Sequence, residues 1–223
     1  MKMEDQTLEE KLRILVVEDK AENIAAARAY FDTRTDIEVD YAVDFVEAHK
    51  LLLTSTRSRK YDGALIDCFF PHSSHTNIRH EYINELLHVA ISAYVEEEGL
   101  SEYPKWKGLA KEYYFRLRDA MYNSESNQPL GILLADKTYR EGIPFRLVTS
   151  EGHHGYLVDS VCTYQRWMGW PEIVDDAYGK KDTADFWKKA YEDELAYSIK
   201  FLQEERKRIE RDIHEDSTNP EEK

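Results

Sequence analysis

The sequence has few cysteines, no long apolar run and no excess of basic side chains, and each absence excludes a class of protein. Its two cysteines, Cys68 and Cys162, are too few for the disulfide framework of a small secreted protein. No apolar stretch approaches the length that crosses a membrane, and the first residues lack the apolar core of a signal peptide. We therefore expect a soluble, cytoplasmic protein that does not bind membranes.

Basic side chains are outnumbered, because 30 Lys and Arg face 44 Asp and Glu and leave a net charge of −14. A protein that binds the phosphate backbone of nucleic acids normally presents a basic face. Nucleic acid is therefore not an expected partner. The 223 residues suffice for one large domain, or for an ordinary domain that carries an insertion.

Two short strand-like runs end in acidic residues. Residues 13–17 are followed by Glu18 and Asp19, and residues 61–67 end at Asp67. Apolar strands of this kind suit a parallel sheet with helices on both faces, where ligands bind outside the carboxyl ends of the strands. The three acids are expected to meet at that edge. Carboxylate oxygens are ligands that Mg²⁺ prefers, so the sequence predicts a magnesium site there.

Strand and helix patterns alternate along most of the chain, which is typical of an α/β, doubly wound fold with five parallel strands. The expected strands cover residues 13–17, 37–41, 61–67, 145–148 and 172–174. The expected helices cover residues 21–31, 43–53, 129–140, 156–167 and 183–195. In the first helix Ile24, Ala27 and Phe31 are spaced to share one buried face.

Residues 72–127 interrupt this alternation with two aromatic-rich helical stretches, which predict an inserted helical hairpin. We expect the hairpin to pack beside the acidic pocket and restrict access to Asp67, and the alternative is a remote appendage. Residues 196–223 are expected to extend the last helix and then to become disordered from Asp216. The expected organisation is thus a domain of residues 1–71 and 128–195, the insertion, and a C-terminal extension.

Three motifs together resemble the receiver domain of the response regulators of two-component signalling. They are ILVVED over residues 14–19, YDGALID over residues 61–67 with Pro71 four residues later, and FRLVT over residues 145–149. The resemblance covers residues 12–71 and 128–195, and it implies a flavodoxin-like fold. It does not cover the insertion or the C-terminal tail.

The resemblance implies a role for each strand-end residue. Asp67 would be the phosphoacceptor, and Glu18, Asp19, Asp67 and the backbone carbonyl of Phe69 would hold Mg²⁺. Thr149 would be the hydroxyl that contacts the phosphoryl group. From the residues alone, Thr149 and its neighbour Ser150 are equally suited to end a strand and cap the next helix.

The resemblance also implies a lysine just after the fifth strand, usually placed before a proline. Here Lys180 and Lys181 stand in that region with no proline after them, and Lys181 is the favoured candidate. The expected function is that of a stand-alone receiver, phosphorylated by a histidine kinase or phosphotransfer protein. It would signal by contact with a downstream protein.

Two other functions fit the same residues. A metal-dependent phosphatase or hydrolase would combine the strand-end acids with nearby histidines, since His72 and His75 follow Asp67 and His153 and His154 follow Thr149. A degenerate receiver would keep the fold as an interaction module without accepting phosphate.

Overall fold

A parallel sheet forms the centre of the protein, whose computed structural model describes residues 11–55, 60–71, 127–150 and 156–218. The four strands lie in the order β2-β1-β3-β6. Their bounds are β1 (Leu12–Val17), β2 (Ile37–Ala42), β3 (Gly63–Asp67) and β6 (Phe145–Val148). All three pairings are parallel. The predicted α/β class with a parallel sheet is confirmed, and this architecture is compatible with a flavodoxin-like fold.

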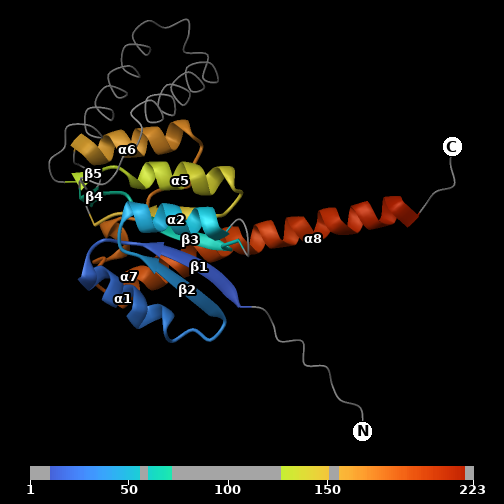
Figure 1. Ribbon diagram of the computed structural model, residues 1–223, viewed down its shortest axis with the longest axis horizontal. Helices are drawn as coiled ribbons and strands as arrows, with labels where there is room; N and C mark the ends of the chain where they lie inside the picture. Colours follow the sequence, from blue (N-terminus) through green and yellow to red (C-terminus); the bar gives the residue numbers. More distant parts are fainter. Residues whose placement is uncertain (1–10, 56–59, 72–126, 151–155, 219–223) are drawn as a thin grey trace, which may run out of the picture.

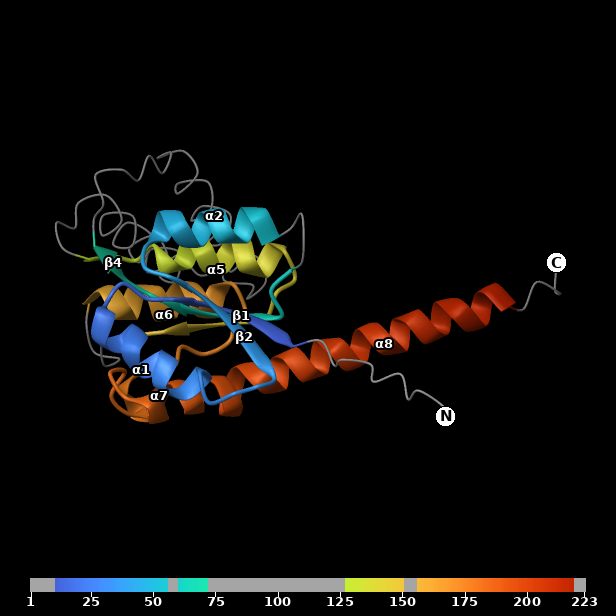
Figure 2. The same cartoon turned by 60° about the horizontal axis from the view of Figure 1, so that its bottom comes forward.

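Helices cover both faces of the sheet, as Figures 1 and 2 show. One layer contains α2 (Phe45–Ser55), α5 (Gly131–Arg140) and α6 (Tyr156–Trp167). The other contains α1 (Ala21–Phe31) and α7 (Ala184–Lys189). Alternate residues of β1 enter the two cores, because Leu15 and Val17 belong to the cluster with α2, α5 and α6, whereas Ile14 and Val16 pack with α1 and α7. Strands β3 and β6 and most of β1 are therefore buried on both sides, whereas the edge strand β2 is partly exposed.

The predicted fifth strand at residues 172–174 is wrong. Only Val174 pairs with β6, in a single parallel bridge to Val148. Val174 donates its backbone N–H to Leu147 and accepts one from Thr149, both at 2.9 Å. Pro171 has no N–H to give to a ladder, and the chain turns into the short helix η2 (Asp176–Tyr178) directly afterwards. The apolar run is thus too short to continue the sheet.

A two-stranded antiparallel ladder forms the base of the segment between β3 and α5. Strand β4 (Phe70–Pro71) pairs with β5 (Asn127–Gln128), with Pro71 opposite Asn127. Asn127, assigned to the insertion from the sequence, therefore belongs to this ladder. The predicted helical hairpin itself lies outside the described residues. The ladder shows that the chain leaves and rejoins the domain at one place, just beyond the carboxyl end of β3.

The C-terminal helix is continuous but changes its winding. After α7 comes a π-helical turn, η3 (Ala190–Leu195), and then α8 (Ala196–Thr218). Disorder was predicted from Asp216, whereas the helix continues to Thr218. Figures 1 and 2 show α8 leaving the body of the domain. None of the described helices is long and apolar enough to cross a membrane.

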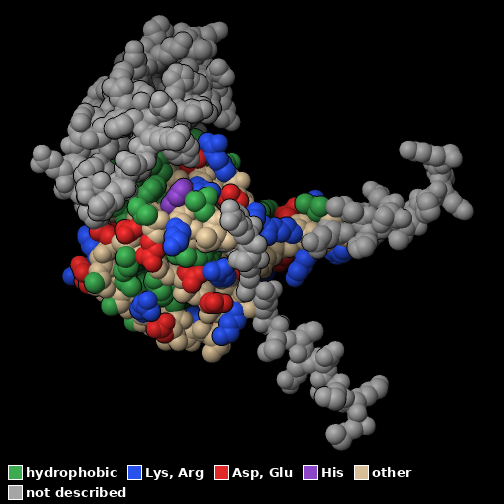
Figure 3. All heavy atoms as spheres, viewed as in Figure 1, with side chains coloured by type: hydrophobic (Ala, Val, Ile, Leu, Met, Phe, Trp, Pro, Cys, Tyr) green, Lys and Arg blue, Asp and Glu red, His purple; other side chains and the backbone are tan. Residues whose placement is uncertain are grey.

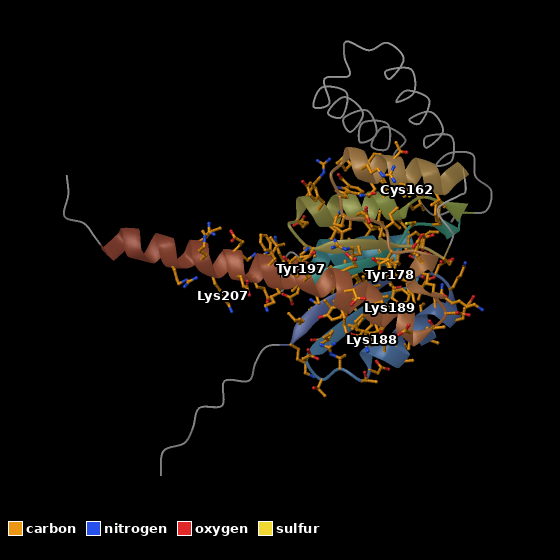
Figure 4. The ribbon with its side chains drawn as sticks, turned by 180° about the vertical axis from the view of Figure 1, so that it is seen from behind. Cys162, Tyr178, Lys188, Lys189, Tyr197 and Lys207 are labelled. Atoms are coloured by element: carbon orange, nitrogen blue, oxygen red, sulfur yellow. The ribbon has the colours of Figure 1, made fainter. Side chains whose placement is uncertain are left out.

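Charged side chains of both signs are interspersed over the described surface seen in Figure 3. Figure 4 shows the molecule from behind, with Tyr178, Lys188 and Lys189 on the side of the domain that α7 covers. Tyr197 lies where α8 is still close to the domain, and Lys207 lies on the part that projects. The projecting helix therefore presents charge to its surroundings.

Candidate functional site

Three acids meet at the carboxyl ends of β1 and β3. Glu18 follows the last residue of β1, whose partner in the ladder immediately precedes Asp67. One carboxylate oxygen from each of Glu18, Asp19 and Asp67 lies within 4.8 Å of the others. Glu18 and Asp67 are buried, and Asp19 is partly exposed. The parallel register thus brings together residues about 50 positions apart in the chain, as expected from the sequence.

Lys181 is the cation of this cluster. Its Nζ lies 2.5 Å from Oε2 of Glu18 and 2.7 Å from Oδ1 of Asp67. Lys181 is only 3% exposed, whereas the neighbouring Lys180 is exposed. Of the two lysines considered from the sequence, the structure therefore places Lys181 beside the acids. One ammonium group between two carboxylates leaves the site with excess negative charge.

Glu18 is held by groups that sequence reasoning did not identify. Its Oε1 accepts hydrogen bonds from the backbone N–H of Lys20 at 3.1 Å and from Nδ2 of Asn23 at 3.0 Å. With Oε2 against Lys181, both oxygens of Glu18 are engaged. Asn23 is buried in the first turn of α1. In the sequence, the feature that could have indicated its role is a polar side chain in the first turn of the helix that follows the acids. Glu18 is consequently fixed in place.

Burial and crowding shift the ionisation of the cluster. Burial raises the pKa of Asp67 to about 7, although Lys181 opposes this shift, and the charge of Glu18 adds to it. Burial, followed by the charge of Glu18, also raises the pKa of Asp19. Burial acts to lower the pKa of Lys181, but Asp67 and Glu18 outweigh it and hold that pKa above its ordinary value. The cluster therefore favours further positive charge.

The donor set fits a hard divalent cation. Asp19 carries a buried Oδ1 that has no hydrogen-bond partner within the described part of the chain, and such an atom normally carries a desolvation cost. Asp19 and Asp67 together offer carboxylate oxygens at this edge of the sheet. Because Asp19 is partly exposed, solvent can reach the cluster there. Mg²⁺ binds through few carboxylates and retains several waters, so these residues suit it.

Thr149 lies at the neighbouring strand end. In the ladder between β3 and β6, Asp67 is opposite Val148, so Thr149 is one residue beyond that pair. Thr149 is buried and its backbone N–H donates to Val174, whereas Ser150 is exposed. Phe69 is buried two residues after Asp67, and the role of its carbonyl as a metal ligand stays a prediction.

Gly131 lets helix α5 begin directly against the site, a feature that sequence reasoning missed. Its backbone N–H donates to the carbonyl of Cys68 at 3.2 Å. A Cβ at this position would lie 2.0 Å from the carbonyl oxygen of Asp67 and 2.9 Å from Cα of Cys68. Only glycine allows this approach of the helix to the strand end.

The histidines that suggested a transition-metal site, His72, His75, His153 and His154, lie outside the described residues. Neither the models of known protein families nor the curated proteins searched give a match to this chain.

Proposed function

We propose that the chain is a receiver domain that accepts a phosphoryl group on Asp67. The observation that carries the proposal is the position of Lys181, whose ammonium group bridges Asp67 and Glu18 beside the partly open Asp19. The motif resemblance in the sequence supports the same assignment. The strand order β2-β1-β3-β6, with Asp67 at the end of the inner strand β3, is consistent with the proposed receiver domain.

In the proposed reaction an oxygen of Asp67 attacks the phosphorus of a donor. A new O–P bond forms as the bond from phosphorus to the leaving group breaks, and the leaving group departs with the bonding electrons. The product is an acyl phosphate on Asp67. Lys181 holds the carboxylate in place before the reaction, and its ammonium group offsets the charge that the incoming phosphoryl oxygens bring.

Asp19 and Asp67 would hold Mg²⁺, with Glu18 and the carbonyl of Phe69 as the further ligands that the resemblance implies. When bound, Mg²⁺ supplies positive charge that offsets crowded carboxylates and phosphoryl oxygens. In this proposal Thr149 contacts the phosphoryl group on Asp67, and its position one residue after Val148, the ladder partner of Asp67, supports that role.

The partners in this proposal are a histidine kinase or phosphotransfer protein as donor, and a downstream protein that reads the phosphorylated state. The proposal also places the protein in the cytoplasm. The alternative hydrolase would combine the same acids with the loop histidines, which lie outside the described residues.

The test is incubation with acetyl phosphate, with and without Mg²⁺, followed by mass spectrometry of the peptide that contains Asp67. We expect one added phosphoryl group that depends on Mg²⁺ and is absent in Asp67→Asn. Asp19→Asn should slow labelling about tenfold or more through weaker metal binding. Glu22→Gln is the matched control, because Glu22 is an exposed carboxylate in the first turn of α1, three residues after Asp19, and its loss should leave the rate unchanged.

Absence of labelling in the wild-type protein, together with no binding of beryllofluoride and Mg²⁺, would contradict the proposal and favour a degenerate receiver. Release of free phosphate with turnover, dependent on a bound transition metal, would instead indicate the hydrolase.

A further inference from the structure

Trp187 lies against Lys181 from the side of α7. Its indole Nε1 donates a hydrogen bond to the backbone carbonyl of Lys181 at 2.8 Å. The ammonium group of Lys181 lies 6.0 Å from the centre of the indole ring. The ring is fully buried and packs in the same core cluster as Val148 and Val174, which form the bridge at the edge of the sheet. One side chain therefore hydrogen-bonds the backbone of Lys181 and lies near its ammonium group.

Lys181 needs such support because it lies in a loop. The chain crosses from the bridge at Val174 to the N-terminus of α7, where Thr183 caps the helix. Gly179 has a φ of +116° in this loop, and no proline follows Lys181. A lysine side chain is a flexible four-carbon stem that loses much rotamer freedom when it is fixed. A hold on its backbone reduces that loss and helps to keep the ammonium group between the two carboxylates.

We infer that Trp187 is a positioning residue that holds Lys181 between Glu18 and Asp67, and this inference rests on the proposed function of that site. The indole N–H fixes the backbone of Lys181, and the face of the ring offers a favourable environment to its charge.

A purely structural role would require only the volume of the ring. The N–H of a buried tryptophan usually finds a hydrogen-bond partner, although that of Trp170 has none among the described residues. Here the acceptor is the carbonyl of the residue that neutralises the acids. Trp170 shows the contrast, since it is also buried but packs in the opposite core cluster against Phe145 and Tyr164.

The test compares Trp187→Phe with Trp170→Phe, which removes a buried indole from the other core cluster, one whose N–H has no hydrogen-bond partner among the described residues. The readout is modification of lysine amines by a limiting amount of acetic anhydride, measured by peptide fragmentation, with Lys180 as the internal reference. In the wild type Lys181 should be protected. Trp187→Phe should raise the ratio of Lys181 to Lys180 modification about fivefold, as expected for one lost hydrogen bond. Trp170→Phe should leave this ratio unchanged.

An unchanged ratio in folded Trp187→Phe overturns the inference, and so does an equal rise in both variants. A second measurement keeps the test valid even for a variant that does not fold, because it leaves Trp187 in place. Lys181→Met removes the cation near the ring and should change the tryptophan emission, whereas Lys180→Met should not. Identical spectra for wild type and Lys181→Met also overturn the inference.

Labelling of Asp67 by acetyl phosphate is measured on the same proteins. Slower labelling of Trp187→Phe than of Trp170→Phe supports the positioning role, and equal rates count against it. If the wild type is not labelled, the proposed function fails, and the amine ratio then decides whether Trp187 holds Lys181. The two failures are therefore distinguishable.

Discussion

Lys181 and the two carboxylates that it contacts form a buried group whose parts depend on each other. Removing one partner from such a group leaves an uncompensated charge, and the cost is commonly about 3–5 kcal/mol. The site still carries more negative than positive charge, since Asp19 adds a third carboxylate. Burial is the main reason why the pKa of Asp67 rises despite the nearby ammonium group, and the charges of Glu18 and Asp19 add to the rise.

The raised pKa of Asp67 predicts that the metal-free protein loses stability as the pH rises. The folded state binds the proton of Asp67 up to about pH 7, whereas the unfolded chain releases it near the ordinary value of 3.8. The stabilising contribution is therefore fully present below pH 3.8 and is lost between about pH 4 and 7. In EDTA, the free energy of unfolding should fall over this range by an amount on the order of a few kcal/mol.

Urea unfolding at pH 5.0 and 7.5 measures this effect, with Asp67→Asn as the comparison because it cannot titrate at this position. The decrease should be clearly smaller in Asp67→Asn than in the wild type. An equal decrease in both proteins would show that the dependence arises from other groups.

At the scale of elements, helix α5 and strand β3 meet without a side chain between them. The carbonyl of Asp67 would overlap a Cβ at residue 131. Gly131→Ala should therefore push the start of α5 away from the strand end and lower stability by about 1–3 kcal/mol. Because the same backbone carries Asp67, labelling by acetyl phosphate should slow as well.

Gly142→Ala is the control for this prediction. Gly142 has a φ of +66° and nothing within 4 Å of the added Cβ, so this substitution costs about 1–2 kcal/mol through its backbone alone. Thermal unfolding and the rate of labelling by acetyl phosphate should distinguish the two variants. Both should be less stable than the wild type, but only Gly131→Ala should be labelled more slowly. Normal labelling in Gly131→Ala would show that the close approach has no bearing on the site.

The sequence predicted the elements whose pattern is local. The strands that end at Glu18 and Asp67 were recognisable because they are short apolar runs followed by acids, and the parallel register then brings these acids together. The prediction of a fifth strand was wrong because Pro171 precedes the segment and η2 follows it, so that only Val174 pairs with β6. In α1, Ile24 was expected on the buried face, yet Asn23 is buried and Ile24 only partly so, because the helix turns a polar side chain to Glu18.

The π-helical turn η3 could not be predicted, because its contacts join distant parts of the chain. Arg146 of β6 is buried, and its Nη2 donates to the backbone carbonyl of Glu194 at 3.2 Å. The carboxylate of Glu194 pairs with the same guanidinium and also accepts from the hydroxyl of Tyr178. A side chain that inserts into the hydrogen-bond ladder of a helix distorts it locally. Nothing in residues 190–195 alone indicates that partner.

At the scale of the whole molecule, two additions are attached to the domain at different places in the chain: the segment between β4 and β5, and helix α8. Helix α8 packs on the domain through Ile199, whose side chain lies against Gly63, and then continues with exposed residues such as Phe201 and Ile209. Its projecting part has ion pairs within the helix, including Lys200 with Glu204 and Arg208 with Glu205. Such pairs stabilise a helix by only about 0.2–0.5 kcal/mol each. The packing of the first turns on the domain therefore contributes most to the stability of α8.

The other addition enters and leaves through the ladder of β4 and β5, directly beyond Asp67. Because Pro71 lies opposite Asn127, residues 72–126 can be replaced by a two-residue Asn-Gly turn that closes the ladder as a hairpin. We expect the shortened protein to keep its fold, since the two core clusters are made by residues outside the deleted segment. Circular dichroism and thermal unfolding measure this, and loss of cooperative unfolding would show that the segment is needed for folding.

The same variant tests the expectation that the segment restricts access to Asp67. Loops at the carboxyl edge of a parallel sheet commonly carry function, and the strand β4 that leads into this segment begins three residues after Asp67, at Phe70. If the segment limits access, its removal should change the rate of labelling by acetyl phosphate, or allow a larger donor such as a phosphorylated histidine protein to react. The shortened protein with Asp67→Asn gives the background. Rates equal to those of the full chain for both donors would leave the segment as a separate appendage, attached beside the site without any influence on it.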